Sequence, residues 1–170
     1  MAKKTGRVVL DLRWILVSIT VLYAIGYLAL SATPGNNPYA HPLGWWGWFD
    51  QGQYLKAANA LIQHDLSPDK HFYPPLYPAT GALFLKWSSG HPYFLLNLFC
   101  LLWFAFVFIR VTDRYISRLG GVLVFFCTSI FNLRIFENYL IPWTTTLGVA
   151  LLATGILGLT WLQDVLDKKS

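Results

Sequence analysis

Residues 14–32 read WILVSITVLYAIGYLALSA, an apolar run without a charged side chain, and this stretch decides the class of fold. A helix rises about 1.5 Å per residue, so a run of this length crosses a hydrocarbon core of about 30 Å. We therefore expect a membrane-spanning helix here. A secretory signal peptide is the alternative, because Ala29-Leu30-Ser31 resembles a cleavage site, and we favour a retained membrane anchor.

Three further apolar blocks follow the first one, at residues 93–109, 119–133 and 144–162. The chain is 55% hydrophobic and only 12% charged, whereas a soluble domain carries about 25% charged residues. We predict an all-α integral membrane protein with about four transmembrane helices. The four blocks and the loop at residues 33–91 would form a single membrane domain over residues 1–170.

The distribution of Lys and Arg predicts how the helices are oriented, because short cytoplasmic segments retain basic residues. Basic side chains precede the first block, separate the second block from the third, and end the chain: Lys3, Lys4, Arg7, Arg13, Arg110, Arg114, Arg118, Lys168 and Lys169. The other side carries only Lys56, Lys70, Lys86 and Arg134. We expect both termini in the cytoplasm, the 33–91 loop on the periplasmic or extracellular face, and a location in the inner membrane. The net charge of +5 is then a topology signal, and no nucleic-acid surface is predicted.

The 33–91 loop opens with turn formers and an aromatic cluster. Residues 34–38 read PGNNP and end the first helix, while residues 45–49 read WWGWF. Such rings are typical of the lipid headgroup region, and a ligand-stacking platform is the alternative. From Asp50 to Leu66 apolar residues recur at helical spacing, which predicts an amphipathic helix on the outer membrane surface. Asp50 and Gln53 can form a capping box at its start.

Prolines dominate the next segment, residues 71–78. Pro74, Pro75 and Pro78 predict an extended stretch that presents tyrosine rings rather than a regular helix. Residues 79–87 are apolar but too short to span, so we expect an interfacial or half-inserted helix there.

Histidine and cysteine give no ligand pattern. His41, His64, His71 and His91 lie in the loop or at helix ends, and a lone histidine is more often simply hydrogen-bonded or solvated. Cys100 and Cys127 fall in different spans without metal-ligand spacing. We assign neither a metal nor a cofactor.

Three stretches carry a resemblance to a known family. Residues 48–54 read WFDQGQY, residues 57–61 read AANAL, and residues 72–78 read FYPPLYP, between a first helix and a Leu-rich helix. This order is similar to the start of a GT-C glycosyltransferase. Within that superfamily the chain most resembles the polyprenyl-phosphate-mannose-dependent mannosyltransferases and their bacterial relatives. The resemblance implies the fold of the N-terminal half of such an enzyme.

The resemblance also implies roles for individual residues. Asp50 would act as general base on an acceptor hydroxyl, as a carboxylate at the water–membrane boundary can. Gln51 stands where many relatives have Glu, which puts a role for two adjacent carboxylates in doubt. Glu137 lies where these folds often place a second acid, and we favour an interfacial group paired to Arg134, with a catalytic acid as the alternative. The candidate substrate-binding residues are Tyr54, Tyr73, Lys70 and Arg134.

Two functions of different class follow. GT-C enzymes have about seven conserved spans and this chain about four, so we favour a non-catalytic subunit that packs against partner helices and lipid. Its partner complex would be bioenergetic, for example photosynthetic or respiratory, or would make envelope polysaccharide. The alternative is a glycosyltransferase, or one half of a split enzyme, that takes sugar from a polyprenyl-phosphate donor on the outer face. A channel or transporter ranks third, because no span has a charge near its centre.

Overall fold

The computed structural model describes residues 11–31, 49–88 and 91–168, and its described residues form helices and no strand. This confirms the prediction of an all-helical protein for these residues. The described residues form seven α-helices: α1 (Leu12–Ser31), α2 (Phe49–Ile62), α3 (Leu76–Leu85), α4 (Phe94–Thr112), α5 (Arg118–Phe125), α6 (Leu133–Leu140) and α7 (Thr144–Asp167). A 3-10 turn, Pro68–Lys70, separates α2 from α3.

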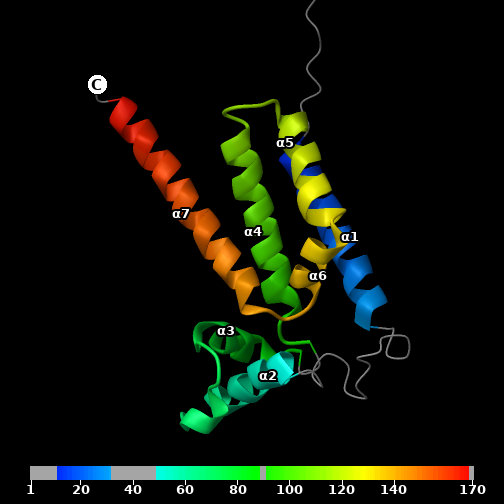
Figure 1. Cartoon of the computed structure of the whole chain (residues 1–170), viewed down its shortest axis with the longest axis vertical. Coiled ribbons are helices and arrows are strands. Elements are labelled where there is room, and N and C mark those ends of the chain that lie inside the picture. The colour runs from blue at the N-terminus through cyan, green and yellow to red at the C-terminus, as the bar shows by residue number, and fades with distance from the viewer. Residues whose placement is uncertain (1–10, 32–48, 89–90, 169–170) are drawn as a thin grey trace, which may run out of the picture.

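Three helices, α1, α4 and α7, are long and apolar enough to cross a membrane. They coincide with the blocks predicted at 14–32, 93–109 and 144–162, although α7 continues to Asp167. In Figure 1 they run lengthwise through the molecule, and α2 and α3 lie across one end. The three long apolar helices indicate a membrane protein.

The block predicted at 119–133 is not one straight helix. After α5 the chain forms a π-helical turn, Phe126–Ile130, and then bends by 74° into α6. The backbone N–H of Phe131 bonds to the carbonyl of Phe126 at 2.8 Å, which ends the helix, and the Asn132 side chain accepts a hydrogen bond from the N–H of Ile135 and caps the next one. A π-turn widens the helix and permits such a break. In the described part of the chain, the number of candidate spans reaches four only if α5 and α6 count as one bent span.

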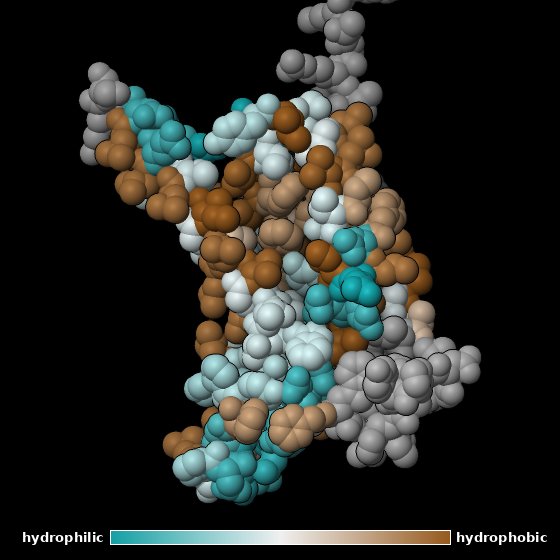
Figure 2. Space-filling model, in the orientation of Figure 1, coloured by the Kyte–Doolittle hydropathy of each residue, from teal (hydrophilic) through white to brown (hydrophobic). Residues whose placement is uncertain are grey.

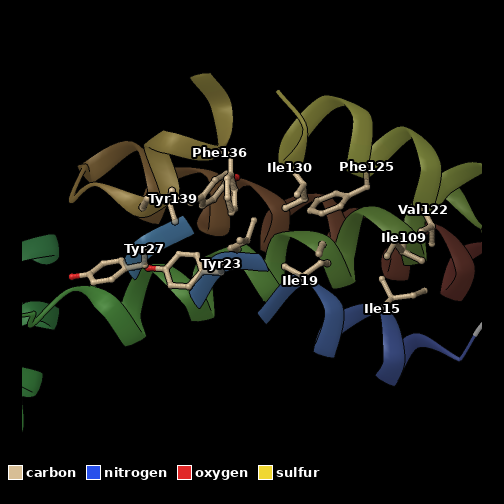
Figure 3. Close-up of a cluster of buried hydrophobic side chains, with 13 residues drawn as sticks. Ile15, Ile19, Tyr23, Tyr27, Ile109, Val122, Phe125, Ile130, Phe136 and Tyr139 are labelled. Atoms are coloured by element: carbon tan, nitrogen blue, oxygen red, sulfur yellow. The ribbon is translucent and has the colours of Figure 1, made fainter. Parts of the chain in front are cut away.

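The main hydrophobic core lies between α1, α4 and the bent pair (Figure 3). Ile19, Tyr23, Phe125 and Leu101 are fully buried in it. Gly26 lets α1 approach α6 closely, because a Cβ at this position would lie 2.9 Å from the Phe136 ring. On its other side α4 packs against α7. The helix α4 is therefore the centre of the bundle.

The structure corrects two expectations about the loop. The helix α3 begins at Leu76, so Tyr77 and Pro78 belong to its first turn and not to an extended stretch. Proline is tolerated there because the first N–H groups of a helix have no intrahelical partner. The helix α2 begins at Phe49, which puts Asp50 inside the first turn rather than at the cap. Residues 33–48, with the predicted turn and most of the aromatic cluster, lie outside the described residues.

The buried face of α2 also differs from the predicted one. Tyr54 and Ala58 are buried as expected, but Ala57, Ala60 and Gln51 are buried with them. Ile62 and Leu66, expected on the apolar face, are exposed. The small side chains of α2 allow it to lie close to α3, so helix–helix packing and not the apolar stripe sets its orientation.

Candidate functional site

Asp50 and Tyr73 form a hydrogen-bonded pair at the end of the molecule where α2 and α3 lie. Asp50 lies in the first turn of α2, where the positive end of the helix dipole favours a carboxylate. The Tyr73 hydroxyl, just before α3, donates to Oδ1 of Asp50. This hydrogen bond raises the pKa of Tyr73 to about 12, with partial desolvation as the second cause. Both side chains are half-buried.

Tyr54 is buried on the inner side of this pair, against the ring of Tyr73, and is not exposed to solvent. The centroid of its ring lies 4.8 Å from that of Tyr73 and 5.2 Å from that of Tyr77. Its backbone carbonyl accepts a hydrogen bond from the Tyr93 hydroxyl at 3.1 Å. Tyr54 was expected to bind substrate, and its buried ring packs against Tyr73 and can hold that residue in place.

Gln51 anchors α2 to the bundle. Its side-chain N–H donates to the carbonyl of Pro142 at 3.1 Å, and the residue is buried. Pro142 lies in the short link between α6 and α7. A buried amide with a partner is stabilising, whereas a buried carboxylate at this position would lack a donor. The glutamine after Asp50 therefore has a structural role here.

Asn97 is a residue that sequence reasoning missed. It lies in the first turn of α4, is buried, accepts a hydrogen bond from the Tyr77 hydroxyl at 2.9 Å and donates to the Ile141 carbonyl at 3.3 Å. It thereby ties α3 and the α6–α7 link to α4. A polar residue in an otherwise apolar span was the available signal, because membrane helices use such residues to hold neighbours.

Lys70 was expected to hold a phosphate, and the structure pairs it with Asp65. Its ammonium donates to Oδ2 of Asp65, and the same carboxylate accepts the backbone N–H of Ser67 at 3.0 Å. These bonds hold the pKa of the Asp65 carboxyl well below its usual range, and the bond with Asp65 raises the pKa of Lys70. In the described part of the chain nothing connects this ion pair to Asp50.

Arg134 and Glu137 lie on the exposed side of α6, while Phe136 and Tyr139 point into the core. Among the described residues neither makes an ion pair, so the expected pairing with each other is absent. In Figure 2 a hydrophilic patch covers α6, on the face that α6 turns away from α1 and α4. No hydrogen bond or ion pair described in the structure joins either residue to Asp50 or Tyr73.

Two exposed phenylalanines flank the Asp50–Tyr73 pair in sequence. Phe49 and Phe72 pack edge to face at 5.5 Å and are 62% and 64% exposed. Aromatic rings with exposed faces beside a carboxylate offer stacking area and a hydrogen-bond acceptor together. The arrangement can accept a proton from a hydroxyl that approaches Asp50, because a carboxylate has four lone-pair sites and Tyr73 uses one.

Comparisons of the chain with models of known protein families, with curated proteins and with solved structures give no match. The fold and the site define a helical membrane protein. Its helices α2 and α3 lie across one end of the bundle and carry a half-buried carboxylate–phenol pair, Asp50 and Tyr73.

Proposed function

We propose that the chain is a non-catalytic membrane subunit and that α7 packs against helices of a partner. One observation carries this proposal: three glycines of α7, Gly148, Gly155 and Gly158, have no atom within 4 Å of the position a Cβ would take. Since a helix turns about 100° per residue, Gly148 and Gly155 lie on the side of α7 opposite the buried Ala150 and Ala153, and Gly158 lies next to that side. In lipid, faces of small residues let another helix approach closely.

The low burial of α7 supports the same proposal. Within its apolar window only 17% of the residues are buried inside the chain, compared with 39% for α4. In Figure 2 hydrophobic side chains cover much of α7, and hydrophilic ones lie at its end near the C-terminus. Lipid can cover the leucines, whereas the flat glycine face packs best against a partner helix. The partner complex would be bioenergetic or would make envelope polysaccharide.

The proposed topology follows the basic residues. The bent pair of α5 and α6 serves as the fourth span, both termini lie on the cytoplasmic side of the inner membrane, and α2 and α3 lie on the outer surface. Arg110, Arg114 and Arg118 then lie on the cytoplasmic side, which agrees with the distribution of basic residues in membrane proteins. Exposed Leu83 and Trp87 in and after α3 suit contact with the headgroup region.

The test is purification from the native membrane in mild detergent, followed by mass spectrometry of what remains bound in stoichiometric amount. Gly155→Leu fills the open face of α7 and should release the partner. Val21→Phe adds bulk at an exposed position of α1 instead, and it should leave the partner bound. Recovery of the wild-type chain alone, or equal recovery of partner with both variants, would contradict the proposal.

The Asp50–Tyr73 pair favours one second candidate, a glycosyltransferase or a subunit of a split one. Asp50 would take the proton of an acceptor hydroxyl while the oxygen of that hydroxyl bonds to the anomeric carbon of the donor sugar. The bond between the anomeric carbon and the phosphate oxygen would break, and the polyprenyl phosphate would leave with its electrons. The Phe49–Phe72 rings would stack against a sugar. Loss of sugar transfer by the assembled complex on Asp50→Asn, with assembly unchanged, would favour this candidate over the subunit.

A further inference from the structure

A cavity of about 500 Å³ opens at the end of the bundle opposite α2 and α3. It lies where α1 begins, α4 ends and α5 begins, as Figure 1 lets the reader follow. Its apolar wall is made by Leu12, Phe106 and Ile109. The volume is within the range of about 300–1,000 Å³ that is common for ligand sites.

Arg110 is the cation available to a ligand at this cavity. Its guanidinium lies over the Phe106 ring, 5.8 Å from the centroid, and the described chain gives it no hydrogen bond or ion pair. The ring contact holds the guanidinium in place while its N–H groups stay unused. A guanidinium binds a phosphate group through two parallel hydrogen bonds, so Arg110 presents a phosphate-binding fork.

The described residues that line the cavity carry charges of both signs. Besides Arg110 the lining contains Arg118 and two carboxylates, Asp11 and Asp113. Arg118 is held by Asp113 through Nε at 2.9 Å and Nη2 at 2.8 Å. Oδ1 of Asp11 accepts the backbone N–H of Arg13 at 2.9 Å, and the residue is exposed. Among the described residues, two cations and two anions line the cavity, which suits a ligand that carries one charge of each sign.

We propose that this cavity binds the headgroup of a zwitterionic aminophospholipid, with the phosphate on Arg110 and the ammonium on Asp11. The cavity lies at the end of two membrane-spanning helices, where headgroups lie, and its apolar wall continues into the faces of α1 and α4. The acyl chains therefore leave the site along apolar helix surface. Asp113 is already paired with Arg118, so an anionic lipid without an amine would place its charge near Asp11 and offer that carboxylate no cation.

The experiment uses the full-length chain in detergent and native mass spectrometry, with phosphatidylethanolamine and phosphatidylglycerol added in equal amounts. We expect phosphatidylethanolamine to bind better by about tenfold, and Arg110→Gln to lower its binding by about tenfold, as loss of a charged hydrogen bond predicts. Arg110→Lys keeps the charge but loses the fork, and it should restore binding only in part. Lys168→Gln, at an exposed position just after α7, should have no effect.

Two further arms separate the possible sources of the phosphate. Asp11→Asn should remove the preference for phosphatidylethanolamine over phosphatidylglycerol, because it removes the partner of the ammonium. Inorganic phosphate should not displace the lipid, since it uses none of the apolar wall. Equal binding of the two lipids to the wild-type chain, unchanged binding to Arg110→Gln, or displacement by inorganic phosphate would each overturn the proposal.

Discussion

The hydroxyl of Tyr73 donates a hydrogen bond to Oδ1 of Asp50, which fixes the chain before α3 against the first turn of α2. The two residues are 23 positions apart, and the buried ring of Tyr54 lies behind the contact. The pair therefore depends on α2 and α3 packing together, and it reports on whether they do.

The first prediction concerns the titration of Tyr73. Because the Tyr73 hydroxyl donates a hydrogen bond to Asp50, the pKa of Tyr73 is raised to about 12 from its ordinary value of 10. A phenol whose pKa is raised in the folded state stabilises the fold at neutral pH, and this contribution is lost only as pH rises above 10 and through about 12. The phenolate absorbance of the wild type minus that of Tyr73→Phe should show this pKa, and Asp50→Asn should lower it. Tyr115→Phe removes an exposed phenol and serves as the spectral control. A difference spectrum that titrates at 10 would contradict the hydrogen bond.

The second prediction concerns the Asp65–Lys70 ion pair. Hydrogen bonds from Lys70 and Ser67 depress the pKa of Asp65, so its contribution to stability is present above about pH 4 and is lost as pH falls below that value. The raised pKa of Lys70 acts in the opposite sense: its contribution is present below about pH 10.4 and is lost as pH rises further. The carboxyl carbon shift of Asp65 in NMR should titrate well below 4. Lys70→Gln should raise that midpoint, whereas Lys56→Gln, whose side chain bonds to the Asp69 carbonyl, should not. A midpoint near 4 in the wild type would contradict the pairing.

Hydropathy predicted α1, α4 and α7 because a span is a local property, set by length and the absence of charge. The break at residues 131–132 was not predictable in that way. Residues 119–133 carry no charge, and the bend depends on the π-turn and on the cap that Asn132 supplies to α6. Similarly, Pro78 argues against a helix only in a helix interior, and it lies in the first turn of α3.

In the candidate site too, some residues were predictable from the sequence and others were not. Asp50 and Tyr73 stand out in the sequence, and the structure brings them together. Gln51 and Asn97 do not, because their partners are backbone carbonyls of the α6–α7 link, 91 and 44 positions away. A sequence shows that a buried amide needs a partner, but only the fold shows which carbonyl faces it.

The third prediction tests Asn97 as the junction between α3, α4 and the α6–α7 link. Asn97→Leu keeps the volume but leaves the Tyr77 hydroxyl and the Ile141 carbonyl without partners. We expect a loss of about 2 kcal/mol in the free energy of unfolding in detergent, the usual cost of buried groups left unpaired. Asn59→Leu is the matched control, because Asn59 is exposed and bonds only within α2. In a cycle with Tyr77→Phe the two losses should be less than additive. Equal stability of the two asparagine variants would show that the Asn97 bonds carry no net energy.

The fourth prediction compares two glycines that differ in their surroundings. A Cβ on Gly81 would lie 2.4 Å from ring atoms of Tyr93, whereas a Cβ on Gly158 would meet nothing within 4 Å. The Tyr93 ring cannot easily move aside, because it stacks on Tyr77 at 4.5 Å and its hydroxyl donates to the Tyr54 carbonyl. Gly81→Ala should therefore cost about 2 kcal/mol through overpacking. Gly158→Ala should raise the stability of the isolated chain by about 0.5–1 kcal/mol, because alanine favours a helix more than glycine does. The measurement is the free energy of unfolding of both variants and the wild type in the same detergent. A Gly81→Ala variant as stable as the wild type would mean that α3 lies farther from Tyr93 than the structure places it.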